Sequence, residues 1–412
     1  MKVALTVSDY AGHYYPMIPL ARALRRAGHQ VTVLCGEGHA RQVAASGLPA
    51  VGCGTDVDTV VQARLGVYLD ALAGRVHHPG LPLLHPLTGA ELDGPDGFDW
   101  PAHAPAHAAA EADRGRTRAQ AVAGFARAER PDLVLHDPLS PEGMLAAHLA
   151  RAPAVCHLWG PTGTDETAHG LAALSPDLPA PARERLGIPA DADLLRYVVD
   201  PCPPQVAPRT RAERLAVRYV PYEGPRPDGP PPAPDGRPRV CVVWSNSLTR
   251  IFGRGSFVVP RILRALSGRG LDVVAALSDE DAASLGPVPD DVRVLPGHRL
   301  SRLLPGSAAV VHHGGAGCAM TALAAGVPQL ALPFGREQAL VAERIAGSGA
   351  GLALHGSTAD GAAIAAAVDA LLTAPSFRQA AAALAAAHGE RPTPDELVPV
   401  LAELAADRVS PR

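Results

Sequence analysis

Residues 308–338 constrain the fold of this chain most strongly, because apolar runs alternate there with a glycine-rich turn. The apolar run 308–311 suits a buried parallel strand. The Ala-rich segment 318–325 favours a helix that ends at Gly326, and a second apolar run follows at 330–332. This order of strand, turn, helix and strand predicts an α/β protein with a parallel sheet.

The turn between the first strand and the helix carries the chemistry of this stretch. Two adjacent histidines precede small residues, which let an anion approach the backbone. The free N–H groups at the start of the helix would then face that anion. The glycines alone are equally compatible with a tight turn that binds nothing. The histidines, together with Glu337 and Gln338 after the next strand, favour a phosphate site.

The same stretch resembles the donor-binding signature of family 1 glycosyltransferases, in the form HHGGAGT…AGVPQ…P…DQ of bacterial enzymes that decorate natural products. The resemblance implies that His313 contacts a diphosphate and that Glu337 and Gln338 face the sugar. Two residues depart from the signature: Cys318 replaces a hydroxyl residue, and Glu337 replaces a shorter Asp. The implied donor-binding residues are His312, His313, Gly315, Ala316, Gly317, Cys318, Glu337 and Gln338.

The N-terminal segment predicts a second parallel sheet. A strand at 2–7, a helix at 16–27 and a strand at 30–34 form a βαβ unit. The first turn lacks the G-x-G-x-x-G pattern of dinucleotide folds, which disfavours an NAD enzyme.

Two residues at strand ends of this sheet are candidate catalytic groups. His13 follows the first strand, where an imidazole could act as a base or cap the helix. The string GHYYPMIPLARALRRAGHQV resembles the opening of the same glycosyltransferase family, which implies that His13 is the general base. Asp137 follows a strand at 132–136 and could orient that imidazole or cap the next helix. The resemblance implies the pairing with His13.

A proline-rich segment, GPRPDGPPPAPDGRP at 224–238, predicts an extended linker between two domains. The resemblance implies a GT-B fold, in which two Rossmann-like domains face each other across a cleft. We therefore expect an acceptor-binding domain at 1–223 and a nucleotide-sugar-binding domain at 239–390. A C-terminal helix in 391–412 can pack back on the first domain.

Other polar positions of the second domain complete the candidate donor site. Ser245 and Asn246 follow its first strand and could face phosphate or sugar, or be ordinary loop residues. His298 follows a strand at 292–295, where the resemblance implies recognition of the nucleobase.

The irregular region 55–112 is rich in histidine, and a metal cluster is one interpretation. Its spacing fits no strong ligand motif, so we expect surface loops and short helices and no metal site. The histidines concerned are His77, His78, His85, His103 and His107.

Composition excludes several classes of partner. The net charge of −4, with histidine neutral, gives no strong field toward nucleic acid or acidic membranes. No run of about 18 apolar residues predicts a membrane span. The six cysteines form no CxxC pair and most lie in apolar runs, which favours reduced thiols and a cytoplasmic protein. A homodimer remains open.

The residues and the resemblance together predict a metal-independent, inverting glycosyltransferase without a cofactor. It would move a deoxysugar from a dTDP- or UDP-sugar to a small natural-product acceptor, with His13 as base. Two alternatives remain: a nucleotide-sugar epimerase of the same fold, and a non-catalytic relative that binds nucleotide.

Overall fold

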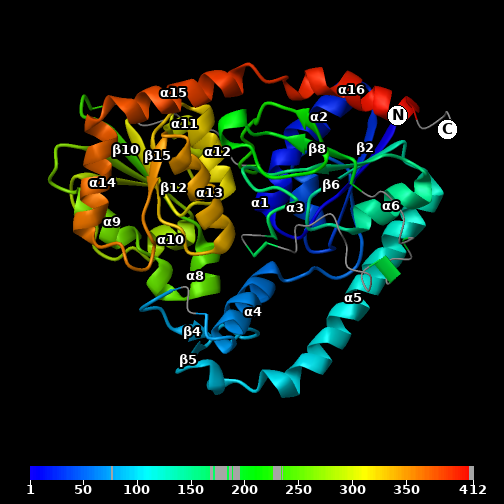
Figure 1. The fold of residues 1–412 in the computed structure, drawn as a ribbon, viewed down its shortest axis with the longest axis horizontal. Helices are drawn as coiled ribbons and strands as arrows, with labels where there is room; N and C mark the ends of the chain where they lie inside the picture. The colour runs from blue at the N-terminus through cyan, green and yellow to red at the C-terminus, as the bar shows by residue number, and fades with distance from the viewer. Residues whose placement is uncertain are drawn as a thin grey trace.

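The computed structural model contains two parallel sheets, one from each half of the chain (Figure 1). The predicted linker lies partly outside the described residues. The structure describes residues 1–75, 78–167, 170–171, 183–184, 188, 195–225, 233 and 235–407.

The first sheet has seven parallel strands in the order β3-β2-β1-β6-β7-β8-β9. Its central strands are apolar runs buried on both faces, as parallel sheets covered by helices require. Strand order reverses between β1 and β6, where Thr6 pairs with His136. His13 and Asp137, which follow these strands, therefore lie at the crevice where such sheets bind ligands. The strands are β1 (Lys2–Thr6), β2 (Gln30–Cys35), β3 (Ala50–Gly52), β6 (Leu133–His136), β7 (Ala154–His157), β8 (Tyr197–Asp200) and β9 (Glu213–Ala216), and the flanking helices are α1 (Ala11–Tyr14), α2 (Ile18–Arg26), α3 (Ala40–Ala44) and α6 (Glu142–Ala150).

The second sheet has six parallel strands in the order β12-β11-β10-β13-β14-β15. Its order reverses between β10 and β13, where Val243 pairs with His312. Ser245 and His313 follow these two strands, so a second crevice forms beside them. The strands are β10 (Arg239–Val243), β11 (Asp272–Leu277), β12 (Val292–Pro296), β13 (Ala309–His312), β14 (Gln329–Ala331) and β15 (Gly351–Ala353), and the helices are α8 (Asn246–Phe252), α9 (Val259–Leu266), α10 (Asp279–Ala283), α11 (Leu300–Leu303), α12 (Ala316–Ala324), α13 (Arg336–Gly347) and α14 (Gly361–Thr373).

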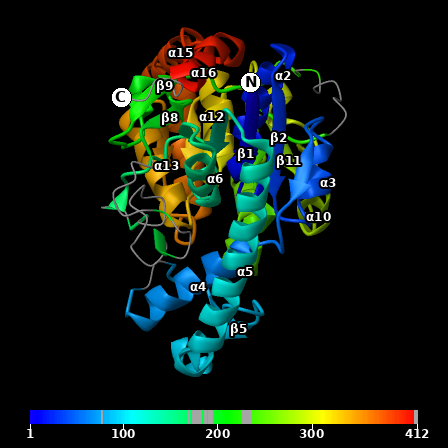
Figure 2. The same ribbon diagram turned by 90° about the vertical axis from the view of Figure 1, so that its right-hand side faces the viewer.

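The region expected to be irregular contains two substantial helices. The helix α4 (Thr59–Leu72) is followed by the short antiparallel pair β4 (Leu83–Leu84) and β5 (Glu91–Leu92), and then by α5 (Trp100–Glu129). These elements project from the body of the molecule in Figures 1 and 2. Surface loops and short helices were expected at 55–112, and irregular chain does lie between these elements, but both helices are longer than expected. Single turns of 3-10 helix lie at Tyr15–Met17, Pro95–Gly97, Pro204–Val206 and Arg254–Ser256.

The C-terminal helices connect the two halves of the molecule. The helix α15 (Pro375–Gly389) lies on the second sheet's side, and α16 (Pro394–Asp407) crosses to α2 (Figure 1). Leu397 and Leu401 are buried in the core of the first sheet. A 2.7 Å ion pair joins Arg26 to Asp395 at the surface of this contact. Across the described residues, no helix combines the length and apolar character needed to span a bilayer.

Candidate functional site

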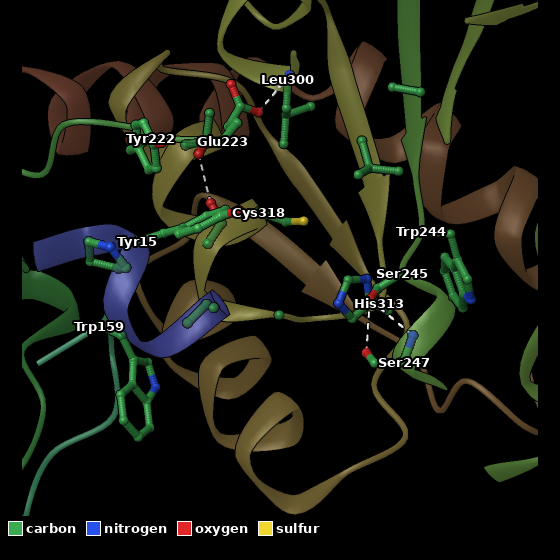
Figure 3. Close-up of a pocket in the computed structure, with 18 of the residues that line it drawn as sticks. Tyr15, Trp159, Tyr222, Glu223, Trp244, Ser245, Ser247, Leu300, His313 and Cys318 are labelled. Atoms are coloured by element: carbon green, nitrogen blue, oxygen red, sulfur yellow. Dashed lines mark hydrogen bonds between the residues drawn. The ribbon is translucent and has the colours of Figure 1, made fainter. Parts of the chain in front are cut away.

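The two crevices open into one cavity of about 430 Å³. Its walls come from both halves of the chain, and Trp159 and Trp244 lie on opposite sides of it with Cys318 between them (Figure 3). A ligand in this cavity would contact both sheets at once. Of the predicted site residues, those that line it are His13, Ser245, His298, His313, Gly315, Ala316, Gly317, Cys318, Glu337 and Gln338.

His13 is held with one ring nitrogen toward the cavity. Its Nδ1 lies 2.9 Å from the Ser8 hydroxyl, and its ring stacks on Trp159 at 4.1 Å between centroids. Its Nε2 has no hydrogen-bond partner among the described residues, so it can take a proton when Nδ1–H donates to Ser8. Burial lowers the pKa of His13 to about 3, which keeps the imidazole neutral. A neutral imidazole with a free nitrogen can accept a proton, but a pKa this far below neutral makes it a weaker base than an ordinary histidine.

Asp137 lies behind Ser8 and is fully buried. Its carboxylate accepts hydrogen bonds from the backbone N–H groups of Ser8, at 2.5 Å, and Leu139, at 2.8 Å. Burial raises the pKa of Asp137 to about 6, against the lowering effect of those bonds and of the Ser8 side chain. Ser8 therefore stands between His13 and Asp137 where the sequence predicted a direct pair. The part of Asp137 in orienting the base stays a prediction.

The two adjacent histidines face different surroundings. His312 is turned into the sheet: Gly314 N–H donates to its Nδ1 at 3.0 Å, and its Nε2 contacts Gln329 Oε1 at 2.9 Å. His312 is not among the residues that line the cavity, and its ring holds the turn; its contact with the donor stays a prediction. Gly314 adopts φ +84°, which favours glycine.

His313 presents an unsatisfied donor or acceptor beside the cavity. Its Nδ1 is buried and has no hydrogen-bond partner among the described residues. Burial, followed by the neighbouring His312, lowers the pKa of His313 to about 3. The other ring nitrogen, Nε2, lies at the start of α12, where a Cβ added at Gly315 would be 2.5 Å from it. Nε2 is therefore the atom that could donate a hydrogen bond to a ligand in the cavity.

The helix α12 begins at the same edge, and its N-cap Gly315 supplies no side-chain cap. The first N–H groups of the helix are therefore available to an anion. Cys318 lies in this first turn and remains a thiol, because burial, followed by Glu223, raises its pKa to about 12. The first turn of α12 therefore offers backbone N–H donors to the cavity, and the neutral thiol of Cys318 stands where the family signature has a hydroxyl group.

Glu337 and Gln338 have different hydrogen-bond partners, since Gln338 bonds the local backbone and Glu337 bonds a residue of the first half of the chain. The Gln338 side-chain oxygen accepts from Phe334 N–H at 2.9 Å and Gly335 N–H at 3.0 Å, which leaves its amide N–H groups as donors. The Glu337 Oε1 accepts from the indole N–H of Trp159 at 2.6 Å, across the cavity. Burial raises the pKa of Glu337, while the bond from Trp159 opposes that shift.

The remaining predicted donor residues lie on the second sheet. The Ser245 hydroxyl caps α8 through Ser247 N–H at 3.3 Å, and His298 lines the cavity after β12. Asn246 begins α8, but its side chain lies outside the described set. Glu223 also lines the cavity and binds the start of α11 through Leu300 N–H at 2.7 Å.

One group of possible metal ligands occurs among the described residues, formed by Asp9, His39 and Asp56. It lies outside the lining of the cavity. Its Asp9 carboxylate already binds Arg118 at 2.6 Å and Gly36 N–H at 2.9 Å. The arrangement is an ion-pair network. Of the five histidines considered in the irregular region, His77 lies outside the described residues, and the four described ones belong to no such group.

Several residues of the site had no predicted role, among them Ser8, Trp159 and Glu223. Trp159 lies two residues after the end of β7, so the rule that selected His13 and Asp137 at strand ends would also have found it. Ser8 lies two residues after the end of β1, so the same rule would have found it, whereas Glu223 follows no strand so closely.

Comparison with known proteins gives a consistent result over both halves of the chain. The family described as erythromycin biosynthesis protein CIII-like matches with its N-terminal domain at residues 115–244 and its C-terminal domain at 261–404. Aklavinone 7-beta-L-rhodosaminyltransferase of Streptomyces galilaeus is 34% identical, over 98% of this chain and 96% of its own length. The 10-deoxymethynolide desosaminyltransferase of Streptomyces venezuelae is 32% identical, over 100% and 99%.

Solved structures of glycosyltransferases share the architecture of this chain over nearly its whole length. Glycosyltransferase VinC in complex with dTDP superposes with a TM-score of 0.73 at 26% identity, covering 99% of this chain and 100% of VinC. Glycosyltransferase SnogD from Streptomyces nogalater has a TM-score of 0.70 at 28% identity, covering 98% of this chain and 99% of SnogD. The doubly wound pair of parallel sheets is thus the GT-B fold that the sequence predicted.

Proposed function

Because this chain belongs to the erythromycin biosynthesis protein CIII-like family of natural-product glycosyltransferases, we propose that it transfers a deoxysugar from a dTDP-sugar to a hydroxyl of a small aglycone, with inversion. Residues 1–223 would hold the acceptor and residues 239–390 the donor. Membership of an enzymatic family favours this activity over the epimerase and non-catalytic alternatives.

The acceptor hydroxyl would lose its proton to Nε2 of His13. The Ser8 hydroxyl holds Nδ1, and Asp137 supports Ser8 from behind. The acceptor oxygen attacks the anomeric carbon as the bond to the diphosphate breaks, which inverts that carbon. Two substrates held in one cavity gain the rate advantage of proximity.

The diphosphate would leave toward the start of α12. Negative charge on its oxygens grows as the sugar bond breaks, and fixed donors aimed at that charge stabilise the transition state. The backbone N–H groups of Gly317 and Cys318 and the buried ring of His313 are such donors. Gln338 and Glu337 would contact the sugar, and His298 would lie at the base.

One observation carries this proposal: a single cavity is lined by a neutral histidine from one sheet and by an uncapped helix N-terminus from the other. The direct experiment incubates the protein with dTDP-L-rhamnose and polyketide aglycones such as aklavinone, and follows glycoside formation by mass spectrometry. A glycoside whose anomeric configuration is opposite to that of the donor is expected. Failure to bind any nucleotide sugar would contradict the proposal.

Deoxysugar donors should be preferred over dTDP-glucose by at least about tenfold in kcat/KM, equivalent to about 1.4 kcal/mol. Glu337 replaces the usual Asp and reaches about 1.5 Å farther, so a fully hydroxylated hexose meets a displaced acceptor. An amino group on the sugar could pair with this carboxylate for about 1.5–3 kcal/mol. Kinetics with one acceptor and several donors test this, and equal efficiency with dTDP-glucose would refute the interpretation of Glu337.

Activity should survive excess EDTA. The proposed stabilisation of the diphosphate uses His313 and the N–H groups of α12 and requires no cation. Initial rates with and without chelator measure this directly. A loss of activity that Mg²⁺ or Mn²⁺ restores would contradict the proposed handling of the leaving group.

A further inference from the structure

Trp159 touches both the catalytic base and the sugar-side carboxylate of the proposed site. It follows β7 in the first sheet and lines the cavity, although its side chain is only 2% exposed. One face of the indole stacks on His13, with 4.1 Å between ring centroids and 18° between planes. Its N–H donates to Glu337 Oε1 at 2.6 Å. This single side chain therefore joins two groups that belong to different domains.

The stacking limits how the His13 ring can turn. Its Nδ1 is bonded to Ser8, its face lies on Trp159, and Tyr10 contacts the ring at 4.8 Å between centroids. Rotation of the ring would break the Ser8 bond and push against the indole. The nitrogen proposed to take the acceptor proton is thus held in one direction, which is what efficient proton transfer requires.

Within the described part of the chain, the hydrogen bond from Trp159 leaves Glu337 with only one unbonded carboxylate oxygen for a sugar. Its Oε1 accepts from the indole and, more weakly, from the Thr162 hydroxyl at 3.4 Å. Its Oε2 has no partner among the described residues and remains available. An indole nitrogen can only donate, so the carboxylate cannot be replaced by a donor at this place. A residue one methylene shorter would withdraw by about 1.5 Å and lose the bond.

The segment that follows Trp159, residues 160–166, packs against and hydrogen-bonds to the second domain. Arg344 of α13 donates to Pro161 O at 2.8 Å and pairs with Glu166 at 2.8 Å. Gly160 lies so close to α12 that an added Cβ would be 2.9 Å from Ala316 Cβ. The indole is therefore fixed relative to both the helix that would bind the diphosphate and the carboxylate.

We propose that Trp159 is a positioning and specificity-determining residue, which orients His13 by stacking and reserves one oxygen of Glu337, so that the sugar meets a single free carboxylate oxygen. This inference rests on the proposed function. A sugar that brings one hydroxyl to this place is satisfied by the free Oε2, whereas a fully hydroxylated hexose brings a second hydroxyl that meets the occupied Oε1. The Trp159–Glu337 pair thus supplies a cause for the expected preference for deoxysugars.

Two variants separate the two contacts of the indole. Trp159→Phe keeps an aromatic face for His13 but removes the N–H, so discrimination between dTDP-L-rhamnose and dTDP-glucose should fall by roughly fivefold, with kcat within about threefold of wild type. Trp159→Leu also removes the aromatic face, so kcat should fall by a further factor of about ten. The matched control is Trp100→Phe at the start of α5, outside the cavity lining, which should change neither quantity.

A double-mutant cycle tests whether the bond itself is responsible. Glu337→Asp is too short to reach the indole, so it should reduce discrimination like Trp159→Phe, and the double variant should lose no more than either single variant. Additive losses would overturn the inference. So would wild-type discrimination in Trp159→Phe, or a Trp159→Leu variant with the kcat of Trp159→Phe.

Binding of dTDP alone, measured by calorimetry, distinguishes positioning from general damage. It should stay within about twofold of wild type in Trp159→Phe, because the indole contacts the sugar side and not the diphosphate. Loss of dTDP affinity in this variant would overturn the inference. A wild-type protein that binds no nucleotide sugar would overturn the proposed function itself. A wild-type protein that transfers sugar while the cycle is additive would remove only the role of Trp159.

Discussion

Replacing His13 with alanine should lower turnover by roughly 100-fold or more, while the affinity for dTDP stays within about twofold. The reason is that His13 lines the cavity with its Nε2 unbonded to any described residue, whereas its other contacts are to Ser8, Tyr10 and Trp159 of its own domain. The donor-binding wall, including His313, is untouched by the change. Single-turnover kinetics and calorimetry measure the two quantities. Turnover within a few-fold of wild type would remove His13 from the mechanism.

His148→Ala is a suitable control, because this histidine is exposed on α6 and lies outside the cavity lining.

The dependence of turnover on pH gives a second test of the roles of His13 and Asp137. A base works while it is neutral, and burial lowers the pKa of His13 to about 3, so its protonation should not limit the rate near pH 6.5. Burial raises the pKa of Asp137 to about 6, so an acid limb near that pH should arise from protonation of Asp137. Asp137→Asn should remove this limb.

Replacing His313 with alanine should weaken dTDP binding by roughly 10- to 100-fold, as expected for loss of a hydrogen bond to a charged group worth about 1.5–3 kcal/mol. The side chain lines the cavity beside the start of α12, with its Nε2 next to Gly315. Burial lowers the pKa of His313 to about 3, so the free ring is neutral and acts as a hydrogen-bond donor. Calorimetric titration with dTDP measures the loss.

His313→Gln provides the matched variant, because its amide N–H can replace part of the imidazole donor. It should recover a portion of the affinity lost in His313→Ala. The turn itself is held by His312, whose two ring nitrogens bond Gly314 and Gln329 and remain in place in both variants. Wild-type dTDP affinity in His313→Ala would exclude this residue from diphosphate binding.

Much of the framework could be predicted because local patterns determine it. Apolar runs such as β13, with polar residues directly after them, indicate buried parallel strands with ligand groups at their carboxyl ends. The same rule brought His13 and His313 to one cavity, although 300 residues separate them in the sequence.

Elements without a clear apolar period were missed. The first half of α5 is mostly exposed and contains Pro105, so its sequence shows no buried stripe to reveal a helix. The helix α13 begins after Gly335, which gives no side-chain cap as a start signal. These helices are instead held by contacts between distant parts of the chain: α5 packs against α6, and the ion pair between Asp70 and Arg336 joins α4 to α13.

The finer geometry of the site depends on distances that no local pattern contains. Whether His13 meets a carboxylate or the Ser8 hydroxyl depends on the path of the loop after β1, which brings Ser8 into contact with both His13 and Asp137. The bond from Trp159 to Glu337 depends on how the two domains face each other. The extra methylene of Glu337 was visible in the sequence, but its partner across the cavity was not.

Because α16 packs on the first domain, the domain that is synthesised first is the one whose core is completed last. The N-terminal half emerges first from the ribosome, yet Leu397 and Leu401 belong to its core. Until these last residues are made, the face of α2 that they cover stays in contact with water. The second sheet, whose strands end at Ala353, can mature before the first is closed. The helix α16 thus completes the core of the first domain at the end of synthesis. A chain that stops before α16 would leave the ribosome with part of that core exposed to water.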